Sequence, residues 1–267
     1  MKEKVKIKDI INCLEEIAPL HWQEDYDNAG LITGNKENEC GGVLICLDVF
    51  ESTMIEAINN KCNFIVSHHP FIFRGIKKLH HGSETQKILT LALKNDIAIY
   101  SSHTNMDSAL LGVNDTLGQL LQLQNIAPLD NNRYFNEKNY LGCGATGELY
   151  KRLNAMNYLQ EIKKQLNIGA IKYSGNIEKS IKKVGFCGGA GSFLIEKAIE
   201  NNCDIFLTGD LKYHDFLTFE NKIILADIGH YESENCIKQR FFDIISKKMI
   251  NFVPLFISTE KNRVKFL

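Results

Sequence analysis

The residues Phe64-Ile65-Val66-Ser67-His68-His69-Pro70 combine a short apolar run with a histidine doublet and a proline. Residues 64–66 have the composition of a buried strand. Proline has no amide hydrogen to donate to a central strand, so the strand must end before Pro70. We therefore expect both imidazoles at the carboxyl end of a strand, where ligands bind in open α/β sheets. Adjacent side chains of an extended segment point in different directions, so the doublet suits two neighbouring metal ions better than one.

The segments around this doublet predict a βαβ unit. We expect a strand over 42–47, a helix over 52–60 and a strand over 62–66. Such a unit implies parallel strands and a right-handed crossover. A helix over 84–94 and a strand over 96–100 follow, and this second strand leads to His103 and Asp107.

The pattern then occurs a second time. Residues 43–70 align without gaps on residues 184–211, with six identical pairs. A later strand over 223–226 leads to His230 and Glu234, as the strand over 97–100 leads to His103 and Asp107. The sequence thus predicts an α/β fold of two related lobes that arose by internal duplication, with βαβ units and mostly parallel sheets.

The expected lobes cover residues 1–125 and 126–245, and residues 246–267 return to the fold with a final strand. We expect loops at Asn131-Asn132 and at 142–147, where Asn and Gly cluster. The remaining expected elements are helices over 5–17, 153–166 and 236–249 and strands over 170–173 and 252–257.

The composition is that of a globular protein that works without a membrane. The chain has 267 residues, of which 44% are hydrophobic and 24% charged, with a net charge of -1. No Lys/Arg run stands out, so nucleic acid is not expected as a main partner. No apolar region follows the charged residues at the start, and no apolar run reaches membrane-spanning length. The eight cysteines show no CxxC spacing. We expect reduced thiols and a cytoplasmic location.

Three imidazoles and two carboxylates form the candidate metal ligands: His68, His69, Asp107, His230 and Glu234. A histidine and a carboxylate four positions apart on a helical turn lie on one face. Nitrogen and oxygen donors suit two divalent ions of Zn, Fe, Mn or Ni, and affinity alone does not choose among these. A bridged pair of ions lowers the pKa of bound water, which is hydrolytic chemistry.

Other polar residues have less specific patterns. His103 either supports a ligand or transfers a proton, and we name it the candidate catalytic residue. Asp210 stands where the repeat aligns it with His69, and it either supports the site or has a structural role. Residues 188–192 form a glycine-rich turn, which we interpret first as a tight βα connection and second as a phosphate cradle.

Two further groups are expected to lie in solvent. The acidic residues Glu24, Asp25 and Asp27 form a charged cluster that is typical of a solvated loop. The second doublet, His80-His81, lies among turn-forming residues and is expected to be exposed.

Across its whole length the chain resembles the NIF3-like family, also known as GTP cyclohydrolase 1 type 2 homologues. The resemblance rests on residues 27–31, 47–49, 67–70, 103–107, 188–192, 208–210 and 229–234. It implies a two-domain α/β fold, a homohexamer built as a trimer of dimers, and a dinuclear metal centre facing an inner cavity. Its ligands would be His68, His69, Asp107, His230 and Glu234, with Glu234 touching both ions. The chain departs from the family pattern at Tyr26, where Trp is common, and at Asp210, where Glu is frequent.

The leading functional hypothesis is a hydrolase that depends on two divalent metal ions and resembles GTP cyclohydrolase 1 type 2. A water bridging the ions would attack a ring carbon of a nucleotide such as GTP or of a related small molecule, and His103 would transfer the proton. The alternatives are a non-catalytic protein that binds or delivers metal, and a metal-dependent phosphodiesterase or phosphatase.

Overall fold

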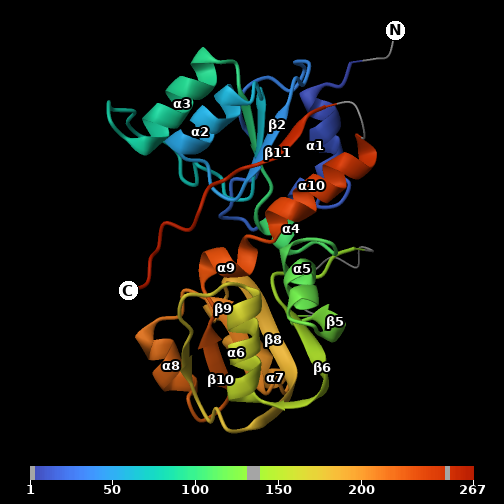
Figure 1. Cartoon of the computed structure of the whole chain (residues 1–267), viewed down its shortest axis with the longest axis vertical. Helices are drawn as coiled ribbons and strands as arrows, with labels where there is room; N and C mark the ends of the chain where they lie inside the picture. The colour runs from blue at the N-terminus through green and yellow to red at the C-terminus, as the bar shows by residue number, and fades with distance from the viewer. Residues whose placement is uncertain (1–3, 131–138, 250–252) are drawn as a thin grey trace. The chain divides into compact units, whose positions relative to one another are not determined.

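The computed structural model describes residues 4–130, 139–249 and 253–267, and these residues form two compact units (Figure 1). Unit 1 lies within residues 1–106 and 237–261, and unit 2 within residues 107–236 and 262–267. The division thus falls earlier than the expected boundaries at 125/126 and 245/246. Residues 113–125, which were expected in the first lobe, lie in unit 2. Helix α5 (Val113–Leu120) packs there against the sheet of that unit.

Unit 1 is built on a five-stranded sheet whose core is parallel. The strand order is β1-β4-β3-β2-β11, in which only the edge strand β1 is antiparallel. The strands are β1 (Gly30–Thr33), β2 (Val43–Cys46), β3 (Phe64–Ser67), β4 (Ala98–Ser101) and β11 (Leu255–Ile257). Every residue of β2, β3 and β4 is buried, as expected for parallel strands covered on both faces.

Helices cover both faces of this sheet (Figure 1). On one face, α2 (Glu51–Asn59) and α3 (Glu84–Lys94) bury Met54 and Ile88 against alternate strand residues such as Ile65. On the other face, α1 (Ile7–Glu15) packs against α10 (Ile237–Lys248). A short 3-10 helix, η1 (Leu20–Trp22), follows α1, and α4 (Thr104–Asp107) follows β4 at the boundary between the units.

Unit 2 has a mixed sheet of order β5-β6-β8-β9-β10-β7. Only its central strands β8, β9 and β10 are mutually parallel, and the three remaining pairings are antiparallel. The mostly parallel character is therefore limited to unit 1 and to the centre of unit 2. The strands are β5 (Gln124–Pro128), β6 (Ala145–Asn154), β7 (Lys172–Ser174), β8 (Ser180–Ala190), β9 (Ile205–Gly209) and β10 (Ile224–Asp227).

The sheet of unit 2 also has a hydrophobic core on each face. Leu117 of α5 and Leu159 of α6 lie in one core, and Ala198 of α7 and Phe206 of β9 lie in the other. The remaining helices are α6 (Ala155–Gln165), η2 (Ser192–Leu194), α7 (Ile195–Glu200), α8 (Tyr213–Phe219) and α9 (His230–Glu234).

The repeat seen in the sequence is also a repeat of topology. In unit 1, Val43 pairs with Phe64 and Phe64 with Ala98, all in parallel register. In unit 2, Val184 pairs with Ile205 and Ile205 with Ile224 in the same way. Since Val184 and Ile205 are the aligned partners of Val43 and Phe64, the duplicated part is the three-strand parallel core of each unit.

Some expectations about individual segments are corrected. The glycine cluster at 142–147 was expected to be a loop, but β6 begins within it at Ala145. Its glycines are needed for packing, since a Cβ at Gly147 would lie 2.7 Å from Leu123 Cβ. The loop expected at Asn131-Asn132 and the start of the strand expected at residue 252 lie outside the described residues.

The eight cysteines are all free, as expected for reduced thiols. Among the described residues, no helix has the length and apolar character that crossing a membrane requires.

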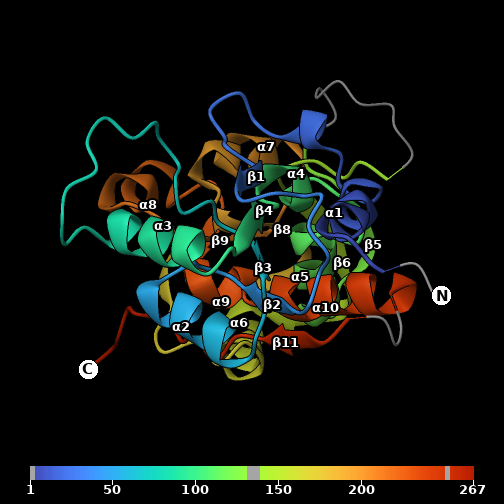
Figure 2. The same ribbon diagram turned by 90° about the horizontal axis from the view of Figure 1, so that it is seen from above.

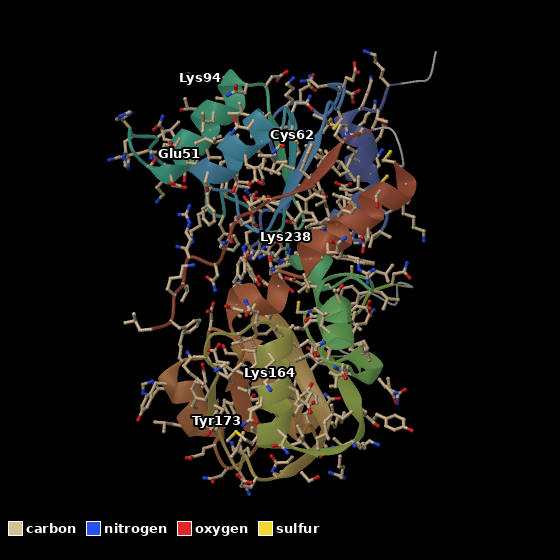
Figure 3. All side chains as sticks on the ribbon, viewed as in Figure 1. Glu51, Cys62, Lys94, Lys164, Tyr173 and Lys238 are labelled. Carbon is tan, nitrogen blue, oxygen red and sulfur yellow. The ribbon has the colours of Figure 1, made fainter. Side chains whose placement is uncertain are left out.

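A buried ion pair joins α10 to the segment after β11. Lys238 Nζ lies 3.4 Å from Glu260 Oε1, and both side chains are almost fully buried (Figure 3 labels Lys238). Glu260 also accepts a hydrogen bond of 2.6 Å from the amide of Leu47. Burial raises the pKa of Glu260, although Lys238 and the hydrogen bonds from Ser258 and Leu47 oppose the rise.

Lys238→Met is expected to lower the free energy of unfolding by about 3–5 kcal/mol near pH 8, because it leaves a buried carboxylate without its cation. This loss of stability should be smaller at pH 5. The pKa of Glu260 is raised by burial, so its protonated form favours folding at low pH and this contribution is lost as pH rises. Urea unfolding at both pH values measures the difference. Lys247→Met, at an exposed position of the same helix, is the control. Equal losses in both variants would contradict the prediction.

Candidate metal centre

The histidine doublet lies where the sequence predicted it, directly after β3. The amides of His68 and His69 donate to the carbonyl oxygens of Cys46 and Leu47, at 3.2 and 2.9 Å. These bonds continue the parallel pairing of β3 with β2 by two residues before Pro70 ends it. The doublet is therefore held by backbone hydrogen bonds on a buried sheet, which is a rigid support for two ligands.

A third imidazole completes this group within unit 1. His103 follows β4, and one ligand atom from each of His68, His69 and His103 lies within 4.8 Å of the others. The ring centroid of His103 is 5.2 Å from that of His68 and 5.3 Å from that of His69. Because β3 and β4 are parallel neighbours, their carboxyl ends bring the three imidazoles together.

Each imidazole of this group is held through Nδ1. His69 Nδ1 lies 2.9 Å from Asp48 Oδ1, and His103 Nδ1 lies 2.8 Å from Asp27 Oδ1. His68 Nδ1 lies 2.9 Å from the carbonyl oxygen of Ser102, which only accepts hydrogen bonds. Nδ1 therefore carries the proton, and in a neutral ring the lone pair is at Nε2. Metal-binding histidines are usually fixed in this way by a carboxylate or a carbonyl group.

Asp27 is not the solvated residue that the sequence suggested. Its side chain is fully buried, and it accepts hydrogen bonds from the amide of Thr104 at 3.1 Å and from the Thr104 hydroxyl at 2.5 Å. Burial by itself raises the pKa of Asp27, but the contacts with His103, Thr104 and Asn28 outweigh it and lower the pKa to about 2. Asp25, in the same cluster, is exposed as expected. Asp27 is thus an ionised group that fixes His103.

Asp27→Asn is expected to lower the free energy of unfolding by about 1–3 kcal/mol at pH 7, because hydrogen bonds to a buried charge are lost. A carboxyl group with a lowered pKa stabilises the fold above its unfolded-state pKa and loses this effect as pH falls towards about 2. The difference from the native protein should therefore shrink between pH 7 and pH 3. Denaturant unfolding at both pH values, with the exposed Asp25→Asn as control, tests this. A difference that does not change with pH would contradict it.

Unit 2 contributes a second group of donors from α9. His230 Nε2 lies 3.1 Å from Glu234 Oε2, so the spacing of four residues does place both on one face of a helix. His230 Nδ1 lies 2.8 Å from Asp210 Oδ2. Asp210 thus holds His230 as Asp48 holds His69.

Asp107 belongs to this second group. A carboxylate oxygen of Asp107 and one of Glu234 lie within 4.8 Å of each other. Both carboxylates also lie near the thiol of Cys187. Burial is the main cause that raises the pKa of Cys187 well above its usual value, and the charges of Asp107 and Glu234 add to the rise. The nearby sulfur therefore stays a thiol, and the available donors are nitrogen and oxygen.

The glycine-rich turn after β8 lies against α9. Gly189 has φ of +63°, and a Cβ there would lie 2.1 Å from Glu234 Oε1 and 3.3 Å from His230 Nε2. The amide of Gly189 donates to Ser233 Oγ at 3.0 Å, and the amide of Gly188 donates to Asn114 Oδ1 at 2.9 Å. Since side chains already accept from these amides, the turn serves as a tight connection and not as a phosphate cradle.

The structure thus brings His68, His69 and His103 together in unit 1, and Asp107, His230 and Glu234 together in unit 2. Each group is described within its own unit. The second doublet, His80-His81, is exposed, as expected. Sequence reasoning missed Asp27 and Asp48 as supports. Both residues lie in motifs on which the family resemblance rests, and this could have pointed to them.

The donors of both groups fit divalent metal ions. Neutral imidazoles fixed through Nδ1 and buried carboxylates are the ligands that Zn²⁺, Mn²⁺, Fe²⁺ and Ni²⁺ accept. The buried groups of both units could hold a metal ion.

Comparison with known proteins identifies the family. The family model for Duf34/NIF3 (NGG1p interacting factor 3) matches residues 5–263. The chain belongs to the Duf34/NIF3 family. A family member from Clostridium perfringens, named GTP cyclohydrolase 1 type 2 homolog, is 31% identical over 96% of this chain and 97% of its own length. A relative of the same name from Lactococcus lactis is 32% identical over 96% of this chain and 97% of its own length.

Solved structures agree with the fold described above. The crystal structure of a hypothetical protein from Staphylococcus aureus superposes with a TM-score of 0.89 at 26% identity, covering 99% of this chain and 100% of its own. A Bacillus cereus protein related to NIF3 superposes with a TM-score of 0.92 at 23% identity, over the full length of both chains. The two-sheet α/β architecture is thus that of the Duf34/NIF3 family.

Proposed function

We propose that the protein is a hydrolase that depends on two divalent metal ions, bound by His68, His69, Asp107, His230 and Glu234. The observation that carries this proposal is the fixing of the imidazoles through Nδ1: two of these histidines by carboxylates and one by a carbonyl group. Such fixing sets the tautomer in which Nε2 offers a lone pair to a metal.

The chemistry follows from the donor set and from His103. When bound, a pair of divalent ions would supply a water of lowered pKa and would stabilise negative charge that develops on a substrate. His103 takes up and returns a proton at Nε2, while the ionised Asp27 keeps the Nδ1 proton in place.

The proposed substrate is a nucleotide such as GTP, attacked at a ring carbon. The names of the relatives in Clostridium perfringens and Lactococcus lactis support this class of substrate. Assembly into a homohexamer stays a prediction, which light scattering on the purified protein can check.

The test combines metal content with turnover. The purified protein should contain two metal equivalents per chain by elemental analysis and convert GTP or a related ring compound. His230→Ala should lose both metal and turnover. His103→Ala should keep the metal and lose turnover, because its role is proton transfer. Bound metal without turnover across a panel of nucleotides would refute the hydrolase, and phosphate release without ring opening would indicate a phosphatase instead.

A further inference from the structure

The loop between β3 and α3 projects away from the sheet of unit 1 (Figure 2). We call residues 71–82 the basic loop, because they include Arg74, Lys77 and Lys78 and no carboxylate. The loop therefore has a net positive charge in a chain whose net charge is -1. The loop starts two residues after His69, so its base lies beside the imidazole group.

Contacts with the segment 26–28 fix the base of the loop. Asn28 Nδ2 donates to the carbonyl oxygen of Ile72 at 2.6 Å, and the rings of Tyr26 and Phe73 are 6.2 Å apart. Asp27, between Tyr26 and Asn28, holds His103. The base of the loop and His103 are thus anchored to the same three residues.

An aromatic ring next to His103, and a second ring that contacts the first, are accessible from solvent. The ring of Phe73 lies edge-on to His103 at 6.0 Å, and Phe73 is 42% exposed. Tyr26, whose ring centroid lies 6.2 Å from that of Phe73, is 62% exposed. Exposed aromatic faces at a site with polar donors are well suited to stack on a flat ring, which is how proteins hold bases without reading their sequence.

The cations of the loop are available to an anion. Arg74, Lys77 and Lys78 are exposed, and within the part of the chain that the structure describes their side chains make no ion pair or hydrogen bond. Some lysines of unit 1, such as Lys6, Lys8 and Lys87, pair with glutamates instead. Unpaired cations close together favour phosphate over a neutral ligand.

We propose that the basic loop and Tyr26 recognise a nucleoside phosphate: Phe73 and Tyr26 stack on its base, and Arg74, Lys77 and Lys78 bind its phosphates. This inference rests on the proposed function, because it names the residues that select the substrate of that site. The ring would lie beside His103, where the proton is transferred, and the phosphates would extend along the loop.

The experiment measures binding by titration calorimetry, with GTP, guanosine and inorganic tripolyphosphate as separate probes of the full chain. The phosphate variant is Arg74→Gln/Lys77→Gln/Lys78→Gln. Its matched control is Lys36→Gln/Lys61→Gln/Lys94→Gln, three exposed lysines of unit 1, of which Lys94 ends α3 (Figure 3). The ring variant is Tyr26→Leu/Phe73→Leu, which keeps apolar bulk but removes the aromatic faces.

The phosphate variant should bind GTP and tripolyphosphate about tenfold or more weaker than the native protein does, and its affinity for guanosine should be unchanged. The salt dependence of GTP binding should also fall. The ring variant should bind GTP and guanosine about fivefold or more weaker than the native protein does, and its affinity for tripolyphosphate should be unchanged. The control should bind all three probes as the native protein does.

Equal binding by the variants and the control would overturn the inference, as would the absence of GTP binding to the native protein. Metal content, measured on the same samples, separates this failure from that of the proposed function. If the samples contain metal and the variants bind the probes as the control does, only the assignment of the loop is refuted. Protein that contains no metal yet shows the predicted pattern refutes the hydrolase and supports the loop.

Discussion

Replacing both His68 and His69 by alanine is expected to lower the affinity for divalent metal by more than about 100-fold. Removing a residue that merely supports a ligand already costs about 10–100-fold, and this change removes two ligands. The fold should survive, because the backbone amides of both residues keep their bonds to Cys46 and Leu47. Elemental analysis after dialysis against a weak chelator measures the loss.

The exposed doublet provides the matched control. His80→Ala/His81→Ala removes the same side chains from a position in solvent and should leave the metal content unchanged. If both double variants keep their metal, the ligand assignment of His68 and His69 is wrong. Circular dichroism on both variants verifies that any loss of metal is not a loss of structure.

Gly189→Ala is expected to have the second largest effect. The added Cβ would lie 2.1 Å from Glu234 Oε1, so the carboxylate must turn away from His230. We expect metal affinity to fall by about tenfold or more. The positive φ adds a cost of about 1–2 kcal/mol to folding, which thermal unfolding measures.

Gly82→Ala separates the two causes. Gly82 has φ of +92°, and a Cβ there meets no atom within 4 Å, so this variant carries backbone strain without a clash. It should lower stability by a similar amount and keep the metal affinity of the native protein. A Gly189→Ala protein that matches Gly82→Ala in metal affinity would show that Glu234 does not depend on the turn.

Local patterns were sufficient to predict the framework that carries the donors. The apolar run before His68 predicted a strand end, and the spacing of His230 and Glu234 predicted one helical face; the structure has both. The repeat predicted a shared three-strand core, and its register is the same in both units. These features depend on residues close together in sequence, where periodicity is informative.

Contacts between distant residues were not predictable in the same way. Asp27 and His103 are separated by 76 positions, and Asp48 and His69 by 21. Nothing in the acidic cluster distinguishes the buried Asp27 from the exposed Asp25, because only the approach of Thr104 and His103 buries one of them. The strand β6 was missed for a related reason: glycines within it and just before it make room for Leu123 and Leu194, which lie elsewhere in the chain.

The interruption of unit 1 by unit 2 along the polypeptide has a consequence during synthesis. Residues 1–106 leave the ribosome first, but α10 and β11, which complete unit 1, follow only after residue 236. Until then β2 is an unpaired sheet edge, of the kind on which other chains can add. The continuous stretch 107–236 can meanwhile assemble most of unit 2. Unit 1 can therefore complete its sheet only after residues 107–236 have been synthesised.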